Sequence, residues 1–214
     1  MSQIDCRIEQ STGRITLRRP EALNALTYEM CERLEAALMA WKDDEKVSQV
    51  IIDAEGEKAF CAGGDIAKLY HKGRAGYFTD VQAFWREEYR LNSLIHHYPK
   101  PYIGFLQGYV MGGGVGISCH GSHRIVGNTT QMAMPECAIG LVPDVGGSYL
   151  LARAPGLTGR FLGITGYRMN AADALHAGFA DSFIAEDRWS KVIEELVSAG
   201  TPGPLSSFID NAGH

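Results

Sequence analysis

Apolar and polar residues alternate near the start of the chain in a way that predicts two short strands. Both lie between residues 4 and 19, and Arg14–Arg18 has the one-in-two pattern of a half-exposed strand. After Thr27 the spacing changes, because apolar side chains recur at intervals of four, four and three from Met30 to Trp41. That spacing predicts a helix with one buried face, and Thr27 is a residue type that caps such a helix.

The middle of the chain repeats the order strand, helix. Val47–Ile52 and Tyr102–Leu106 are short apolar runs with β-branched residues, which is typical of strands buried on both faces. Phe78–Tyr98 has a helical pattern that ends before two prolines, and a short helix is expected from about Gly113. The same order continues through residues 122–134. This alternation predicts an α/β fold built from stacked β–α units.

Beyond residue 158 the pattern predicts mainly short helices. The clearest are Ala171–Ala177 and Asp187–Ala199, with a strand-like segment at Phe179–Ile184 between them. Residues 198–205 are rich in Gly and Pro and have the composition of a linker. We therefore expect a core domain over residues 1–165, followed over 166–214 by the beginning of a helical region that is incomplete in this sequence.

Composition and charge narrow the class of protein. The 214 residues are 45% hydrophobic and 21% charged, so a packed core can form. A net charge of −5 argues against a nucleic acid or a membrane surface as the main partner, and no apolar run reaches the roughly 18 residues that spanning a bilayer requires. The N-terminus has no basic region followed by an apolar one, so we expect no secretory signal. The five cysteines are widely spaced without a C-x-x-C. These features predict free thiols in a reducing cytoplasm.

Sequence motifs for several other chemistries are absent. The chain has no G-x-x-x-x-G-K-[ST] loop and no G-x-S-x-G elbow. The glycines at 112–116 do not fit G-x-G-x-x-G, because Cys119 stands where the third glycine should be. The histidines at 96–97 and 120–123 match no zinc signature, so we expect satisfied or solvent-facing side chains rather than metal ligands. What remains is acid–base chemistry supported by backbone donors.

Two glycine-rich stretches could supply those donors. Gly63 and Gly64 precede an aspartate that can cap a helix, and Met111–Gly116 leads from a buried strand into a helix with almost no side chains in its first turn. Free N–H groups at such turns can stabilise an oxygen that becomes negative during a reaction. Each stretch also has a structural interpretation. For the first, a tight turn is the commoner reason; for the second, close helix–strand packing is an equally good one.

The third stretch, residues 134–147, contains two carboxylates in almost wholly apolar surroundings. Glu136 and Asp144 lie eight residues apart. Carboxyl groups in such surroundings tend toward raised pKa values and can act as acids or bases near neutral pH. The structural alternatives are that Asp144 caps the following helix and that Glu136 is exposed on a loop.

Together, these stretches resemble the enoyl-CoA hydratase/isomerase, or crotonase, superfamily over essentially all of residues 1–200. Within it, the likeness is greatest to the branch of 3-hydroxyisobutyryl-CoA hydrolases. The motifs that carry the resemblance are Phe84–Tyr89, Met111–Gly116 with Ser118–Gly121, and Ala133–Gly147. The resemblance implies a spiral of repeated β-β-α units, followed by a helical C-terminal region, and a role in valine breakdown.

The resemblance also assigns roles to particular residues. The N–H groups of Gly64 and Gly113 match those that form the family's oxyanion hole, which holds the thioester carbonyl of an acyl-CoA. Glu136 matches the acidic residue shared by hydratases and hydrolases, and Asp144 matches an aspartate typical of the hydrolases. These four residues are the implied catalytic groups. Glu88 matches a hydrolase position that contacts the acyl part of the substrate, so all five are expected to bind substrate.

One departure from the hydratase pattern bears on the reaction. Hydratases that use two glutamates carry one of them where this chain has Gly116. Adding water across a double bond needs both a base and an acid, whereas thioester hydrolysis can use one glutamate assisted by an aspartate. We therefore expect hydrolysis of a short-chain acyl-CoA, 3-hydroxyisobutyryl-CoA above others, with Glu136 as base or nucleophile. The alternatives are enoyl-CoA hydration or isomerisation, and a catalytically silent acyl-CoA-binding relative.

The resemblance implies no metal and no redox cofactor, because coenzyme A enters as part of the substrate. Members of the family commonly form trimers or hexamers through their helical part, so a homo-oligomer is the assembly it implies. Relatives in the hydrolase branch continue well beyond the length of this chain. We therefore expect the chain to be truncated at its C-terminal side.

Overall fold

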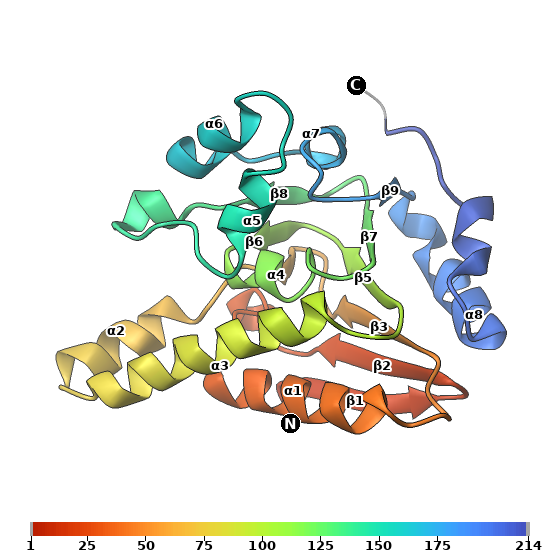
Figure 1. The fold of residues 1–214 in the computed structure, drawn as a ribbon, viewed down its shortest axis with the longest axis horizontal. Coiled ribbons are helices and arrows are strands. Elements are labelled where there is room, and N and C mark those ends of the chain that lie inside the picture. Colours follow the sequence, from red (N-terminus) through yellow and green to blue (C-terminus); the bar gives the residue numbers. More distant parts are fainter. Residues whose placement is uncertain (1, 213–214) are drawn as a thin grey trace.

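Two β-sheets form the centre of the computed structural model, which describes residues 2–212 (Figure 1). The strands are β1 (Ile4–Glu9), β2 (Thr12–Leu17), β3 (Gln49–Ala54), β4 (Ala59–Cys61), β5 (Tyr102–Leu106), β6 (Tyr109–Met111), β7 (His123–Val126), β8 (Gln131–Ala133) and β9 (Ser182–Phe183). The larger sheet has the order β1-β2-β3-β5-β7-β9, and the smaller one has the order β4-β6-β8. Only the β1–β2 pair is antiparallel among these described strands.

Helices surround both sheets. The α-helices are α1 (Tyr28–Lys42), α2 (Ile66–Arg74), α3 (Phe78–His96), α4 (Gly113–Gly116), α5 (Gly147–Leu151), α6 (Thr158–Thr165), α7 (Ala171–His176) and α8 (Trp189–Ala199). The 3-10 turns are η1 (Pro20–Ala22), η2 (Glu136–Ile139), η3 (Glu186–Arg188) and η4 (Gly203–Ser207). No helix within residues 2–212 is long and apolar enough to cross a membrane.

The chain winds through both sheets in repeated steps. Each of the strands β3, β5 and β7 belongs to the large sheet and is followed at once by a short strand of the small sheet, namely β4, β6 or β8. A helix or helical turn then leads to the next pair of strands. This order confirms the predicted α/β class and the spiral of β-β-α units.

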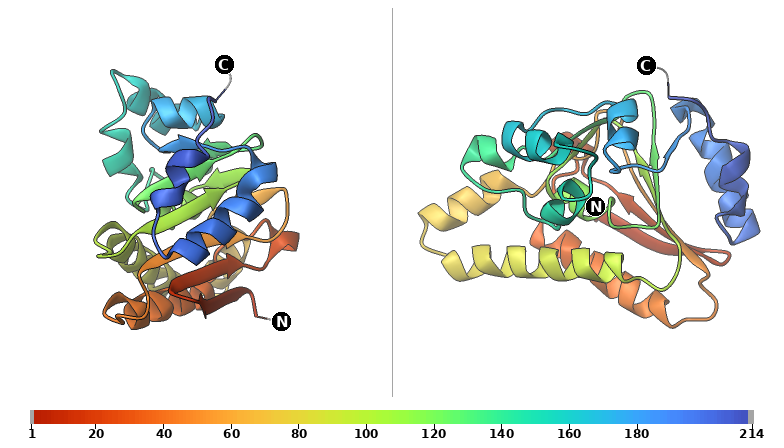
Figure 2. Two further views of the ribbon diagram at one scale, coloured as in Figure 1. Left: turned by 90° about the vertical axis from the view of Figure 1, so that its right-hand side faces the viewer. Right: turned by 45° about the horizontal axis from the view of Figure 1, so that its top comes forward.

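Side chains of the large sheet alternate between two apolar clusters. In β3, Val50 and Ile52 point into a cluster shared with α1 and α3, whereas Ile51 points to the opposite face, toward α8. Ile103 and Phe105 in β5 follow Ile51 into this second cluster. The alternation has the period of two that a pleated strand imposes. Figure 2 shows α8 lying across the sheet, on the face away from α1 and α3.

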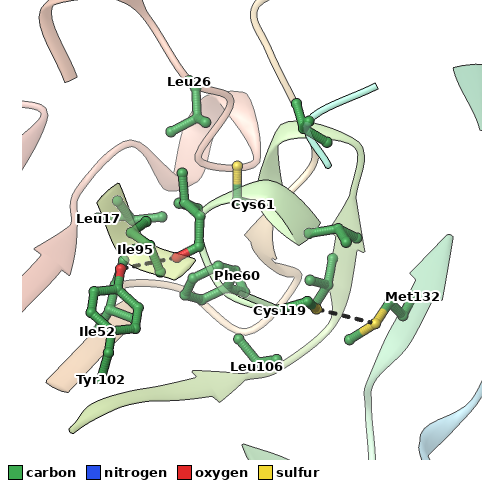
Figure 3. Packing of buried hydrophobic residues seen from close by; sticks show 14 of the residues in the cluster. Leu17, Leu26, Ile52, Phe60, Cys61, Ile95, Tyr102, Leu106, Cys119 and Met132 are labelled. Carbon is green, nitrogen blue, oxygen red and sulfur yellow. Dashed lines mark hydrogen bonds between the residues drawn. The ribbon is translucent and has the colours of Figure 1, made fainter. Parts of the chain in front are cut away.

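The first cluster fixes the place of α4, which the site depends on. Figure 3 shows buried side chains of this cluster, among them Phe60, Cys61, Tyr102 and Met132, which come from strands of both sheets. The Tyr102 hydroxyl is fully buried and donates a hydrogen bond to the Ile117 carbonyl, one residue past α4, at 2.9 Å. The glycine-rich helix is therefore held at its end by the body of the protein.

Several predicted elements agree with the structure, and some boundaries shift. The helix after Thr27 runs to Lys42, and the Thr27 side chain accepts a hydrogen bond from Met30 N at 3.3 Å, as a capping residue does. The strand Tyr102–Leu106 and the helix start at Gly113 are confirmed. The long helix ends at His96, two residues earlier than predicted.

The prediction of a linker at residues 198–205 is wrong. This segment folds into the end of α8 and the start of η4, and Leu205 and Phe208 are buried in the second cluster. The error has a physical cause: Gly200 ends α8 in a left-handed conformation, and the prolines that follow begin a 3-10 turn. Glycine and proline at a helix stop have the same composition as a flexible linker.

Candidate active site

The five residues predicted to form the site line one cavity of about 100 Å³. Gly64 follows β4, Gly113 begins α4, and Glu88 lies on α3. Glu136 begins η2, and Asp144 lies in the loop before α5. The repeated β-β-α steps bring these separate segments to a common point, where backbone donors and carboxyl groups face the same space.

Two backbone N–H groups at this cavity make no hydrogen bond within residues 2–212. The residues before and after Gly64 form backbone hydrogen bonds with Leu26, but the Gly64 N–H does not. Leu26 N donates to Gly63 O at 2.8 Å, and Asp65 N donates to Leu26 O at 2.9 Å. Gly113 starts a helix, so its N–H has no partner in a preceding turn. A Cβ placed on Gly113 would lie 3.3 Å from Gly64 N, so the two donors are neighbours.

The carboxyl groups explain why glycine occupies these positions. Gly112 has a φ of 48°, and a Cβ there would lie 2.8 Å from Glu136 Oε1. A Cβ on Gly113 would collide with Glu88 Oε1. Side chains at 112 or 113 would therefore displace the carboxyl groups from the donors.

Glu136 is buried, which contradicts the alternative that it is exposed on a loop. Its side chain is 6% exposed, and Oε2 has no hydrogen-bond partner in the described protein. Burial raises the pKa of the Glu136 carboxyl to about 7, and the negative charge of Asp144 adds to this rise. Near neutral pH the group can therefore accept and release a proton.

Glu88 is a second buried carboxyl group in the same cavity. It is 2% exposed, and its Oε1 also lacks a partner among the described residues. Burial, followed by the charges of Asp144 and Glu136, raises the pKa of Glu88 to about 8. The pattern of the sequence alone did not single it out. The available signal is an acidic residue on the buried face of a helix, between Phe84 and Leu91.

Asp144 is held by Tyr89, a residue that sequence reasoning missed. The Tyr89 hydroxyl donates a hydrogen bond to Asp144 Oδ2 at 2.6 Å. Asp144 does not cap α5 through its side chain, because Gly146 is the N-cap and no side-chain cap bond is present. The helix-cap alternative is therefore wrong, and the carboxylate lines the cavity instead.

His97, His120 and His123 each have a ring nitrogen within hydrogen-bond distance of a protein group. His120 Nε2 lies 2.8 Å from the Val145 carbonyl, and burial lowers the pKa of the ring. A carbonyl can only accept, so Nε2 carries the proton. No cluster of three or more His, Cys, Asp or Glu suited to a metal ion occurs within residues 2–212.

Residues 12–212 match the model of the family described as enoyl-CoA hydratase/isomerase. The chain is 46% identical over 190 residues to the mitochondrial 3-hydroxyisobutyryl-CoA hydrolase of Danio rerio, covering 89% of this chain and 50% of the relative. It is 41% identical over 202 residues to the corresponding human protein, covering 94% of this chain and 52% of the relative. The chain thus spans about half the length of the curated relatives it matches.

Solved structures with the same fold carry different names. A crystal structure of an enoyl-CoA hydratase from Rhodobacter sphaeroides has a TM-score of 0.94 and 53% identity, covering 100% of this chain and 62% of the other. A carnitinyl-CoA dehydratase from Mycobacterium thermoresistibile has a TM-score of 0.96 and 40% identity, covering 100% of this chain and 63% of the other. The fold is therefore shared by proteins named as hydrolases, hydratases and dehydratases.

The prediction of a cytoplasmic location is wrong, because the curated relatives are named as mitochondrial proteins. All five cysteines are free in the structure, as predicted. Free thiols argue against an oxidising compartment, but they do not distinguish one reducing compartment from another.

Proposed function

Because this chain belongs to the enoyl-CoA hydratase/isomerase, or crotonase, family, we propose that its site hydrolyses a short-chain acyl-CoA thioester. The substrate we propose is 3-hydroxyisobutyryl-CoA, which would give 3-hydroxyisobutyrate and coenzyme A. The observation that carries this proposal is the pairing of two unused N–H donors with the Glu136 carboxyl in one cavity. The names of the curated relatives, at 41% and 46% identity, support the choice of substrate.

The proposed reaction begins with the thioester carbonyl oxygen on the N–H groups of Gly64 and Gly113. These donors stabilise the negative charge that develops on that oxygen, and one such donor is typically worth about 3 kcal/mol in the transition state. Ionised Glu136 takes a proton from water as the water oxygen attacks the carbonyl carbon, or it attacks that carbon itself. The C–S bond then breaks, coenzyme A leaves as the thiolate, and the proton held by Glu136 passes to that thiolate. If Glu136 attacks the carbon itself, the acyl group is left on its carboxylate as a mixed anhydride, which water hydrolyses to release the acid and restore Glu136.

Glu88 and Asp144 are proposed to bind the 3-hydroxy group and to tune Glu136. Glu88 keeps its proton near neutral pH, so it can donate a hydrogen bond as well as accept one. Asp144 contributes negative charge that raises the pKa of Glu136. The two groups thus give the acyl end of the cavity both a donor and an acceptor.

Hydration of an unsaturated acyl-CoA is the second candidate, because Glu88 gives the cavity a second buried glutamate beside Glu136. The name of the Rhodobacter sphaeroides structure also favours it. Against it stands the position of Gly116, where two-glutamate hydratases carry an acid. A Cβ there would lie 2.8 Å from both Asn92 Nδ2 and Val145 Cβ, so a larger side chain would force Asn92 and Val145 to move.

The test measures thiol release from 3-hydroxyisobutyryl-CoA and, in parallel, hydration of crotonyl-CoA. The wild type, Glu136→Gln and a control substitution of an exposed residue, Glu194→Gln, are compared. We expect thiol release without hydration, a loss of about 10²–10⁴ in rate for Glu136→Gln as a general base, and no loss for the control.

Each other outcome has a distinct meaning. Hydration without thiol release would replace hydrolysis by the second candidate, and near-normal turnover by Glu136→Gln would remove Glu136 from its role. Silence toward both substrates would reject catalysis by this chain. Acyl-CoA binding to the same sample would then identify a silent binding relative.

A further inference from the structure

The loop after Asp144 contains a strained turn. Gly147 N donates a hydrogen bond to the Asp144 carbonyl, and the two residues between them both have positive φ, 45° at Val145 and 75° at Gly146. Positive φ at both central positions is the pattern of a type I′ turn, which favours Gly, Asn and Asp. Gly146 suits it, but a β-branched residue rarely adopts this conformation. Val145 therefore stays in place only because its surroundings hold it there.

Two contacts hold Val145. Its side chain is 2% exposed and packs beside Gly116, whose own Cβ would come within 2.8 Å of Val145 Cβ. Its carbonyl accepts a hydrogen bond from His120 Nε2 at 2.8 Å. His120 lies four residues after α4, so the segment that follows the proposed oxyanion-hole helix also fixes the strained turn.

A third contact holds the carboxylate itself. The Tyr89 hydroxyl reaches across from α3 and donates to Asp144 Oδ2 at 2.6 Å. Asp144 Oδ1 accepts no hydrogen bond from any described protein group. The carboxylate is thus fixed through one oxygen, while the other remains available to a ligand of the cavity that Asp144 lines.

We propose that Tyr89 and His120 are positioning residues that fix Asp144 for recognition of a hydroxyl group on the acyl part of the substrate. This inference rests on the proposed function. A carboxylate held in one place accepts a hydrogen bond from a hydroxyl at one position, and an acyl group without that hydroxyl leaves it unpaired. Sites built in this way discriminate strongly against analogues that lack the hydroxyl. Neither residue needs to touch the reacting atoms.

The experiment compares kcat/KM for 3-hydroxyisobutyryl-CoA and for isobutyryl-CoA, which lacks the hydroxyl. In Tyr89→Phe and in His120→Ala we expect the ratio of the two values to fall by about tenfold or more, because the hydroxylated substrate loses its advantage. His120→Gln should restore most of the ratio, since its amide N–H can replace the Nε2–H donor. Tyr149→Phe is the matched control, because the Tyr149 hydroxyl makes no hydrogen bond to the described protein, and its ratio should not change.

An unchanged ratio, or an equal loss for both substrates, would overturn the inference. Tyr89 is 44% exposed, so Tyr89→Phe is expected to fold and carries the test if His120→Ala does not.

A wild type that hydrolyses neither substrate would instead reject the proposed function. Hydrogen exchange of the Gly147 amide, which closes the turn, then decides whether the two residues hold Asp144. Faster exchange in Tyr89→Phe and His120→Ala, but not in Tyr149→Phe, would support the holding role. Equal exchange in all of them would overturn it.

Discussion

Glu88 and Glu136 are acids of the same kind in one cavity, but they differ in how readily each gives up its proton. Burial dominates the rise in pKa at both, and Glu88 is the more deeply buried of the two. With pKa values of about 8 and about 7, the first to ionise as pH increases is Glu136. Two acids separated in this way by their surroundings can divide the roles of donor and base.

The order in which Glu136 and Glu88 ionise predicts the pH dependence of the proposed reaction. In the proposed reaction the active form of Glu136 is the carboxylate, so the rate of thiol release should rise as pH increases through about 7 and should fall below it. Rates measured from about pH 5 to about pH 9 test this, with controls for spontaneous thioester hydrolysis. A rate that is flat across neutral pH would contradict the assignment of Glu136 as the ionising base.

The ionised carboxyl group of Glu88 is expected to lower the free energy of unfolding at high pH. Its pKa is raised from 4.5 to about 8 in the folded protein, so between these values the folded state holds a proton that the unfolded state has lost. The free energy of unfolding therefore falls as pH increases through this window. Replacing Glu88 with Gln removes the charge, and we expect a gain on the order of 2 kcal/mol at pH 9 with little change at pH 4.

Urea unfolding at both pH values measures this difference. Glu194→Gln, on the exposed side of α8, is the control and should show little change at either pH. An equal effect of Glu88→Gln at the two pH values would show that the carboxyl charge is not the cause.

At the scale of elements, α4 is a four-residue helix whose position depends on packing rather than on its own stability. All four of its residues are buried, and a side chain at Gly116 would meet Asn92 and Val145. Because Val145 also belongs to the turn that follows Asp144, any change at position 116 acts on both segments.

We therefore predict that Gly116→Glu creates no hydratase. Overpacking should destabilise the fold by about 1–3 kcal/mol or more, and hydration of crotonyl-CoA should stay absent. Gly73→Glu in α2 is the matched control, because a Cβ there meets nothing within 4 Å. Thermal unfolding and the hydration assay check both parts, and a stable, hydrating Gly116→Glu protein would refute the prediction.

The sequence pattern was sufficient to predict elements that repeat their apolar positions several times or consist of one continuous apolar run. The helix Tyr28–Lys42 repeats its apolar positions over four turns, and the run Tyr102–Leu106 is apolar throughout. The strands β4, β6 and β8 have three residues each, which is too short for a period to appear. The start of helix α2 was indicated by Asp65, whose side chain caps it by accepting a hydrogen bond from Lys68 N, but the extent of the helix was not predicted, because none of its residues is buried.

The residues of the candidate site also differ in how well the sequence alone could predict them. Backbone donors and acids in apolar stretches leave a local signal, which pointed to Gly64 and Glu136 before any resemblance was considered. Tyr89 and His120 leave none, because their partners lie 55 and 25 residues away along the chain. A hydrogen bond between distant segments can be predicted only once the fold brings them together.

At the scale of the whole molecule, the second cluster joins late segments of the chain to early strands. Gln49 Nε2 in β3 donates to the Leu196 carbonyl in α8 at 2.7 Å, and Ser48 Oγ donates to the Gly200 carbonyl at 2.7 Å. The Leu196 side chain is fully buried in the cluster. Helix α8 is therefore part of the body of the fold.

Leu196→Ala should destabilise the protein by about 2–5 kcal/mol, because removing most of a buried leucine side chain leaves a cavity that the neighbouring side chains do not fill. Glu194→Ala, on the exposed side of the same helix, should change the free energy of unfolding by no more than about 0.5 kcal/mol. Urea unfolding measures both. Equal, small effects would show that α8 is only loosely attached to the sheet.

The position of α8 also has a consequence for biosynthesis. A ribosome makes the chain from its N-terminus, so Ile51, Ile103 and Phe105 emerge long before the helix that covers them. Until α8 and η4 have left the ribosome, the nascent sheet presents an uncovered apolar face. During that interval, the growing polypeptide offers a binding site for chaperones and a route to aggregation, both of which disappear when the helix docks.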